Sequence, residues 1–252
     1  MFDLQKASML KRASAWLLDV ILLSVLATGF ALLLSAAFGY DNYNDNLQRY
    51  YTEYEQLYGI DFNISDEEYL ALGEEDRLRY ADAYAKLNDD ADVSRAFSII
   101  IQLSLAIMSL SVLLAYMALE FAVPVWLKNG QTVGKKIFGL AVMRTDSARV
   151  KPIAMLIRTL LGKYTIETMA PLLIIFLILF GSLGTVGLIM LAALALLQIV
   201  LIAATRTNSA IHDILAQTVV VDMESQMIFD SAREREARRR EYAEADSARW
   251  GQ

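Results

Sequence analysis

The chain has 252 residues and no cysteine, which excludes a disulfide framework, thiolate chemistry and cysteine metal sites. Its single histidine, His212, excludes the zinc sites that need two or more imidazoles. Of all residues, 56% are hydrophobic and gather in long uncharged runs, while 29 acidic and 23 basic side chains lie in blocks between them. This pattern predicts an integral membrane protein and not a soluble enzyme.

The first apolar run predicts a membrane-spanning helix over residues 13–38, preceded by an N-terminal segment of residues 1–12. Three basic residues before the run would also suit a cleaved signal peptide: Lys6, Lys11 and Arg12. However, Val20 to Phe38 contains 19 residues without a charge, whereas the apolar region of a cleaved signal has about 7–15. We therefore expect the helix to be retained.

The rest of the chain alternates between polar and apolar segments. We expect an acidic segment over 39–95, a second helix over 96–119, a basic connection over 120–164, a third helix over 165–181, a fourth over 183–204 and a charged tail over 205–252. The predicted fold class is an all-α membrane protein with four transmembrane helices. It includes a helical acidic extracytoplasmic insertion and a short cytoplasmic connection that resembles a β-hairpin.

The distribution of basic residues predicts the orientation. The segment 39–95 carries five basic residues against fifteen acids, whereas 128–163 carries eight basic residues against one acid, Asp146. Because basic loops stay in the cytoplasm, the acidic segment should face outward and both termini inward. The expected location is the cytoplasmic (inner) membrane of a bacterium or archaeon.

Local patterns predict structure in both connections. In the acidic segment, Ser65 and Glu68 have capping-box spacing, and 74–87 has a helical stripe, although a solvated acidic linker remains an alternative. In the basic connection, 133–144 and the residues near Val150 suggest a hairpin around a turn at 145–147. An interfacial helix should follow over 152–164, beginning at a proline.

Asp19 is the most informative single residue, because it lies one third of the way into the first expected helix. A carboxylate there is costly unless it is paired or protonated, so such acids usually face the protein interior. If the membrane begins at Val20 instead, Asp19 lies at the interface. Arg12 is two helical turns away, about 10 Å along the axis. We therefore expect each to meet a partner from another helix.

His212 and Asp213 follow the fourth expected helix and should lie on the same side of the membrane as Arg12. An ion pair between Arg12 and Asp213, or one between Asp19 and Arg158, would bring the ends of the helices together. These five residues form the predicted charge site, with either a structural role or a role in ion or proton binding: Arg12, Asp19, Arg158, His212 and Asp213. His212 on its own is more often a hydrogen-bonding residue than a switch.

Residues 130–136, Gly-Gln-Thr-Val-Gly-Lys-Lys, invite comparison with a phosphate-binding loop. The spacing between the glycines is one residue too short, and Lys136 stands where Ser or Thr is required. No nucleophile–base–acid arrangement and no carboxylate pair of recognisable spacing occurs elsewhere in the sequence. We expect no catalytic residues, cofactor or metal site, and no nucleic-acid partner.

Taken together, these motifs resemble the RDD family of membrane proteins, named for one arginine and two aspartates. The matching residues are Arg12, Asp19 and Asp213, with 130–142 similar to the family's glycine–lysine stretch. Two features depart from the family pattern: the acidic segment is longer than usual, and Gln217 stands where a glycine is common. The resemblance implies the architecture above and a role in transport, with cation/proton antiport suggested for some members.

Two functions fit the sequence. The first is transport of ions or small solutes, with Asp19 binding a cation or proton, which predicts a homo-oligomer because four helices form a small pore. The second is a non-transporting scaffold in the lipid bilayer that recruits protein partners through residues 41–92 or 224–250. A membrane enzyme ranks third because no catalytic set is present.

Overall fold

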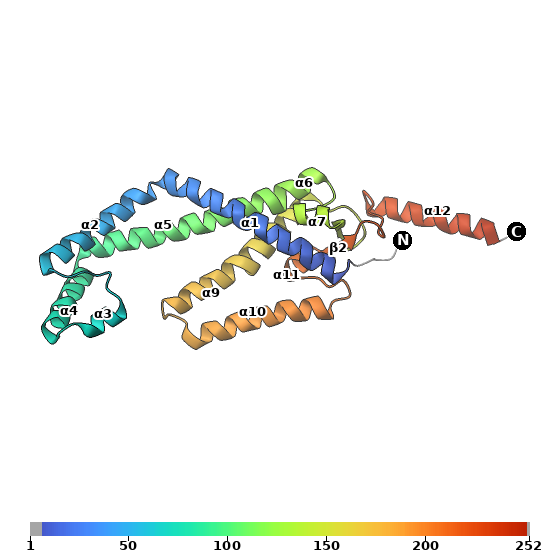
Figure 1. Cartoon of the computed structure of the whole chain (residues 1–252). Coiled ribbons are helices and arrows are strands. Elements are labelled where there is room, and N and C mark those ends of the chain that lie inside the picture. Colours follow the sequence, from blue (N-terminus) through green and yellow to red (C-terminus); the bar gives the residue numbers. More distant parts are fainter. Residues whose placement is uncertain (1–6, 251–252) are drawn as a thin grey trace. The chain divides into compact units, whose positions relative to one another are not determined.

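The computed structural model describes residues 7–250, with the backbone alone at 246 and 248–250 (Figure 1). Lys6 and the rest of the first six residues lie outside this range, as do the last two of the tail. The chain divides into two compact units. The first unit contains residues 1–28 and 112–252, and the second contains Gly29–Ser111.

Four helices are long and apolar enough to cross a membrane, which confirms the predicted number among the described residues. Their outer side chains are uncovered: Leu32 is 69% exposed, Ile189 63% and Ile199 63%. Apolar helices left open in this way need lipid around them. The spans are α1 (Met9–Phe38), Ala91–Leu127 (α5 Ala91–Tyr116, η1 Met117–Ala122, α6 Val123–Leu127), Pro152–Leu179 (α8 Pro152–Leu156, η2 Ile157–Met169, α9 Ala170–Leu179) and α10 (Gly184–Ala204).

The third span differs from the sequence prediction. An interfacial helix over 152–164 and a separate span from 165 were expected, but one continuous helix runs from Pro152 to Leu179. The interfacial helix was expected because Arg158 and Lys163 would then face lipid head groups. Instead both are buried against carboxylates of the first unit. Because both charges are paired inside the protein, the helix can continue without the break that was expected near residue 165.

The η2 segment, Ile157–Met169, has π-helical rather than α-helical hydrogen bonding. In an α-helix, residues five apart diverge by about 140°, because each residue turns the helix by about 100°. In a π-helix the i→i+5 hydrogen bond places such residues one above the other. Arg158 and Lys163 therefore lie on one face of η2.

A two-stranded antiparallel sheet joins two segments of the first unit that are distant in the sequence. Strand β1 (Leu140–Arg144) pairs with β2 (Thr218–Asp222), with Leu140 opposite Asp222. The predicted hairpin-like turn at 145–147 is present but short: it has an antiparallel bridge between Met143 and Arg149 and a backbone hydrogen bond from Arg144 N–H to the Ala148 carbonyl oxygen at 2.8 Å. The main partner of β1 is β2, which was not predicted. Buried Val220 of β2 packs with Leu140 and Val142 of β1, and partly buried Val150 packs against the same cluster.

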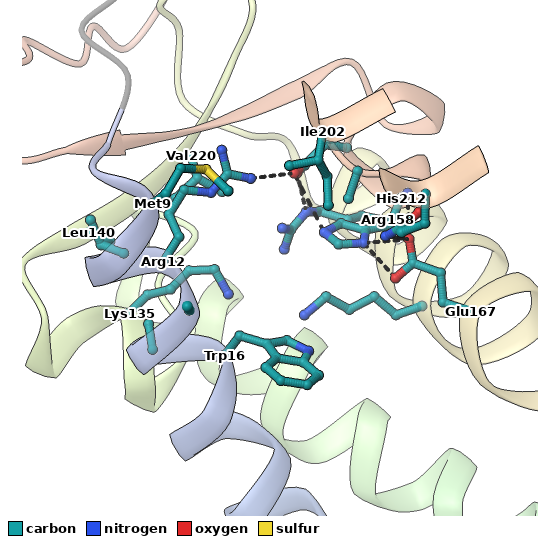
Figure 2. Close-up of a pocket in the computed structure, with 16 residues that line it drawn as sticks. Met9, Arg12, Trp16, Lys135, Leu140, Arg158, Glu167, Ile202, His212 and Val220 are labelled. Atoms are coloured by element: carbon teal, nitrogen blue, oxygen red, sulfur yellow. Dashed lines mark hydrogen bonds and ion pairs between the residues drawn. The ribbon is translucent and has the colours of Figure 1, made fainter. Parts of the chain in front are cut away.

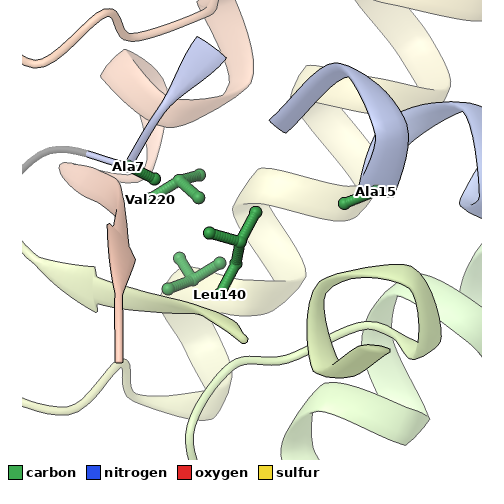
Figure 3. Packing of buried hydrophobic residues seen from close by; sticks show 5 residues of the cluster. Ala7, Ala15, Leu140 and Val220 are labelled. Atoms are coloured by element: carbon green, nitrogen blue, oxygen red, sulfur yellow. The ribbon is translucent and has the colours of Figure 1, made fainter. Parts of the chain in front are cut away.

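One face of the sheet packs against the beginning of α1 (Figure 3). The cluster consists of buried Ala7, Ala15, Leu140, Val142 and Val220. Ala7 also donates its backbone N–H to the carbonyl oxygen of Val220, at 3.4 Å. The sheet therefore fixes the position of the start of α1, the helix that carries Arg12 and Asp19.

The second unit has a core of its own. It contains α2 (Tyr40–Tyr58), α3 (Asp66–Ala71), α4 (Glu74–Asp89) and most of α5. The predicted capping box is present, with Ser65 and Glu68 each bonding the other's backbone N–H. Helix α2 was not predicted. Its buried Leu47 packs with Leu87, Val93, Ala96 and Ile100, surrounded by tyrosines and Phe62.

Candidate functional site

Asp19 holds the start of the short helix α7 (Val133–Ile137) in the first unit. Its Oδ1 accepts the backbone N–H of Gly134 at 2.8 Å, and its Oδ2 accepts the Thr132 hydroxyl at 2.5 Å. The Lys135 ammonium lies 3.5 Å from Oδ2. The Gly-Gln-Thr-Val-Gly-Lys-Lys stretch thus binds an internal carboxylate, and Asp19 is buried at 8% exposure.

Gly134 is required at this contact. A Cβ built there would lie 2.3 Å from the Ala15 carbonyl oxygen and 2.8 Å from Asp19 Oδ1, well inside contact distance. The absence of a side chain lets α7 approach α1 closely enough for the Asp19 hydrogen bonds.

Asp213, on α11 (Ile211–Leu215), is the centre of a second group of charges. Its Oδ1 accepts Arg158 Nε at 3.0 Å and the Thr218 hydroxyl at 3.0 Å. Its Oδ2 lies 3.7 Å from an Arg12 guanidinium nitrogen and 3.5 Å from His212 Nε2 (Figure 2). Both Asp213 and Arg158 are almost completely buried. Two arginines from different helices therefore share one carboxylate.

Glu167 and His212 form a third pair. Nδ1 of His212 lies 2.8 and 2.7 Å from the two Glu167 oxygens, and Gln198 donates to Oε1 at 3.2 Å. The pair depends on close packing between Gly162 and His212. A Cβ built on Gly162 would lie 2.4 Å from His212 Cβ. Helix η2 thus passes directly against α11.

Glu120 and Lys163 complete the set, with a 2.5 Å separation between carboxylate and ammonium. The Thr159 hydroxyl also donates to the Glu120 carbonyl oxygen at 2.8 Å. We call the nine residues of these groups the charge cluster: Arg12, Asp19, Glu120, Lys135, Arg158, Lys163, Glu167, His212 and Asp213. With His212 neutral, its four cations balance its four carboxylates.

A cavity of about 360 Å³ opens within the charge cluster. Figure 2 shows Met9, Arg12, Lys135 and Leu140 on one side of it and Arg158, Glu167, His212 and Ile202 on the other. Asp19 and Glu120 do not line it. Within the described residues, no group of three His, Cys, Asp or Glu could hold a metal ion.

Burial changes the proton affinities of the cluster residues that lie outside the spans. Burial, with help from the nearby Lys163 charge, lowers the pKa of Lys135 to about 8. Burial alone would raise the pKa of Asp213, but the charges of Arg158 and Arg12 hold it below its usual range. Asp213 is therefore ionised at neutral pH, and Lys135 loses its proton at a pH slightly above neutral.

The lowered pKa of Lys135 predicts a pH dependence of stability. Between pH 8 and 10.5 the unfolded chain holds this proton more tightly than the folded one, so the Lys135 contribution rises with pH. From about pH 7.5 to about pH 9.5 the gain should be roughly 2 kcal/mol, at about 1.4 kcal/mol per pKa unit. The free energy of unfolding of the Lys135→Met variant, measured in detergent, should not show this increase between the two pH values.

The neighbouring Lys136 is exposed and supplies the control. Lys136→Met should keep the pH dependence of the wild type. Equal pH dependence in wild type and Lys135→Met would contradict the prediction.

The structure brings together four of the five residues in the predicted site: Arg12, Arg158, His212 and Asp213. The expected contact between Arg12 and Asp213 is present at 3.7 Å. The alternative pairing of Asp19 with Arg158 is wrong, because Asp19 contacts Lys135 and Arg158 contacts Asp213. Whether these residues bind an ion or proton stays a prediction.

Sequence reasoning missed Glu120, Lys135, Lys163 and Glu167. A signal existed for Glu167, since it falls inside the third expected helix and an acid there points to the protein interior, as for Asp19. No comparable signal existed for Lys135, which was one of eight basic residues in its connection.

Four membrane-spanning helices with balanced buried charges define an integral membrane protein. Over residues 6–217 the chain matches the sequence model of the RDD family. The match covers most of the chain, so the protein belongs to the RDD family. Comparisons with curated proteins and with solved structures gave no significant match.

Proposed function

We propose that this protein transports an ion or small solute across the membrane, and that the cavity in the charge cluster is its binding site. The observation that carries the proposal is the cavity of about 360 Å³ among spanning helices, lined by charged or titratable side chains: Arg12, Lys135, Arg158, Lys163, Glu167, His212 and Asp213. Buried polar cavities of this kind in membrane proteins usually mark solute or ion pathways.

Asp19 is not the binding residue in this proposal. Both of its oxygens already accept hydrogen bonds, and it lies outside the cavity lining. Its role is to position Lys135, which does line the cavity. Exchange of a cation or proton through Asp19 would require breaking the contacts that hold α7.

The orientation we propose places both termini and the charge cluster in or next to the cytoplasm, in keeping with the basic residues of 128–163. The acidic segment then faces the other side. Because one chain supplies only four spans, we propose a homo-oligomer as the transporting form.

Reconstituted protein should carry labelled solute into liposomes. We expect uptake above that of protein-free liposomes for at least one of Na⁺, K⁺, phosphate and acetate. Glu167→Gln should reduce this uptake at least tenfold, because it removes a charge from the cavity wall while keeping the side-chain size. Transport is measured with the solute gradient directed into the liposomes and, in a second experiment, out of them.

The control is Glu224→Gln, an exposed residue outside the cavity, which should transport as the wild type does. No uptake of any of the four solutes by folded protein would contradict transport. Uptake unaffected by Glu167→Gln would contradict the assignment to this cavity.

A scaffold is the second candidate, favoured by the separate core of the second unit. A segment that folds around Leu47 and Leu87 presents a defined surface, unlike a solvated linker. On this alternative, deletion of 41–92 abolishes copurification of a stable partner while Glu167→Gln leaves it unchanged.

A further inference from the structure

We infer that the cavity in the charge cluster binds an oxyanion joined to an apolar group, such as the phosphate of a lipid or the carboxylate of a fatty acid. The inference rests on the proposed function in that it names the solute class of the same cavity. Three features carry it: the sign of the lining charge, an unpartnered buried donor, and an apolar wall.

The lining charge is positive. Four cations border the cavity, whereas only two carboxylates do: Arg12, Lys135, Arg158 and Lys163 against Glu167 and Asp213. The carboxylates that balance Lys135 and Lys163 stand behind them, outside the lining. The ammonium and guanidinium groups would repel a cation in this space and attract an anion.

The two lining carboxylates are already engaged. Asp213 holds Arg158 and Thr218, and its second oxygen lies between His212 and Arg12. Glu167 accepts a bond from Gln198 and contacts the His212 ring nitrogen. Among the described residues Asp213 Oδ2 accepts no hydrogen bond, but its charge is offset by Arg12 and Arg158, so neither carboxylate lacks a partner within the protein.

Arg158 has a donor to spare. Its Nη1 has no hydrogen-bond partner among the described residues, although the side chain is only 1% exposed. A buried guanidinium nitrogen without a partner is rare, because its donors are strong and cannot be given up. Arg158 lines the cavity, so an oxyanion there could accept this N–H together with the amine of Lys135.

The rest of the wall is apolar. Met9, Trp16, Leu140, Ile202 and Val220 line the same space. The cavity volume lies in the range of sites for organic ligands, about 300–1,000 Å³, and far exceeds the roughly 30 Å³ of one water. Bare inorganic phosphate would leave these side chains without a partner, whereas a hydrocarbon group would cover them.

Equilibrium binding to the full chain in a neutral maltoside detergent tests the inference. The probes are dioctanoyl phosphatidic acid, laurate, dioctanoyl phosphatidylcholine and inorganic phosphate, with binding followed by calorimetry. We expect saturable binding of phosphatidic acid or laurate with a Kd at least tenfold below those of phosphatidylcholine and inorganic phosphate. Tighter phosphatidic acid identifies a membrane lipid as the source, and tighter laurate identifies a fatty acid.

Two pairs of variants place the ligand. Lys135→Gln should weaken binding at least tenfold, whereas Lys136→Gln, its exposed neighbour, should change it less than twofold. Trp16→Ser should also weaken binding, whereas Trp126→Ser, exposed and outside this cavity, should not. Trp16 is 62% exposed, so its replacement leaves the fold intact should Lys135→Gln not fold.

Several results would overturn the inference: phosphatidylcholine or inorganic phosphate bound as tightly as phosphatidic acid and laurate, no saturable binding, or equal effects within both variant pairs. The assay contains no gradient, so it is independent of flux. Transport without this selectivity refutes the ligand class alone, and selective binding without transport refutes the proposed function alone.

Discussion

Asp213→Asn should destabilise the protein by about 3–5 kcal/mol, the cost expected when one partner of a buried ion pair is removed. Asp213 is the carboxylate shared by Arg12 and Arg158, and its side chain is completely buried. Asparagine keeps the shape but removes the charge, leaving Arg158 in the interior without compensation. Reversible unfolding by dodecyl sulfate in mixed micelles measures the loss.

Asp222→Asn is the matched control. Asp222 pairs with Lys11 at 2.6 Å, but these side chains are 18% and 41% exposed. Pairs open to water contribute about 0–1 kcal/mol. A loss at Asp213 no greater than that at Asp222 would show that Arg158 finds another partner. The double variant Arg158→Met with Asp213→Leu should recover part of the stability, because this buried pair then carries no charge.

Gly134→Ala should cost about 2–3 kcal/mol, toward the upper end of the range for overpacking. The added methyl would lie 2.3 Å from the Ala15 carbonyl oxygen, a backbone atom that cannot turn aside. Helix α7 must then move away from α1, which lengthens the Asp19 hydrogen bonds to Gly134 and Thr132. The same dodecyl sulfate titration measures the effect.

Gly29→Ala tests whether the effect comes from the close approach. Apart from its chain neighbours and the adjacent backbone of α1, no atom of the described residues lies within 4 Å of a Cβ built at Gly29. In the interior of α1, alanine should stabilise the helix by up to about 1 kcal/mol. Equal losses at the two glycines would exclude steric contact as the cause at Gly134.

The spans could be predicted from the sequence because each depends on local composition. Uncharged apolar runs of about twenty residues are typical of membrane-spanning helices, and the capping box at Ser65 and Glu68 is a pattern of neighbouring residues. Helix α2 was missed because its apolar stripe is sparse. Leu47 is its one fully buried residue, and tyrosines supply most of the remaining contacts.

The charge cluster could be predicted only in part, because its contacts join distant segments. Asp19 and Lys135 are far apart in the chain, and nothing in either neighbourhood specifies the other. The π-helical geometry of η2 added a second obstacle. With α-helical spacing, Arg158 and Lys163 would point in different directions, so a sequence projection does not place them on one face.

Gln217 shows where a departure from the family pattern has a structural consequence. Its φ is +52°, in the left-handed region that favours glycine. It lies just before β2, where the resemblance to the family led us to expect glycine, and it keeps the glycine-like backbone at some conformational cost. The turn geometry is therefore retained although the residue that usually allows it is not.

The position of Asp213 near the end of the matched region bears on how the protein is made. Translation delivers Arg12, then Arg158, and only afterwards the acid that neutralises both. Until α11 leaves the ribosome, a nascent chain whose spans have already been synthesised holds two arginines that have no permanent counter-ion. The charge balance of Arg12 and Arg158 is therefore completed only when α11, a later segment of the chain, folds against them.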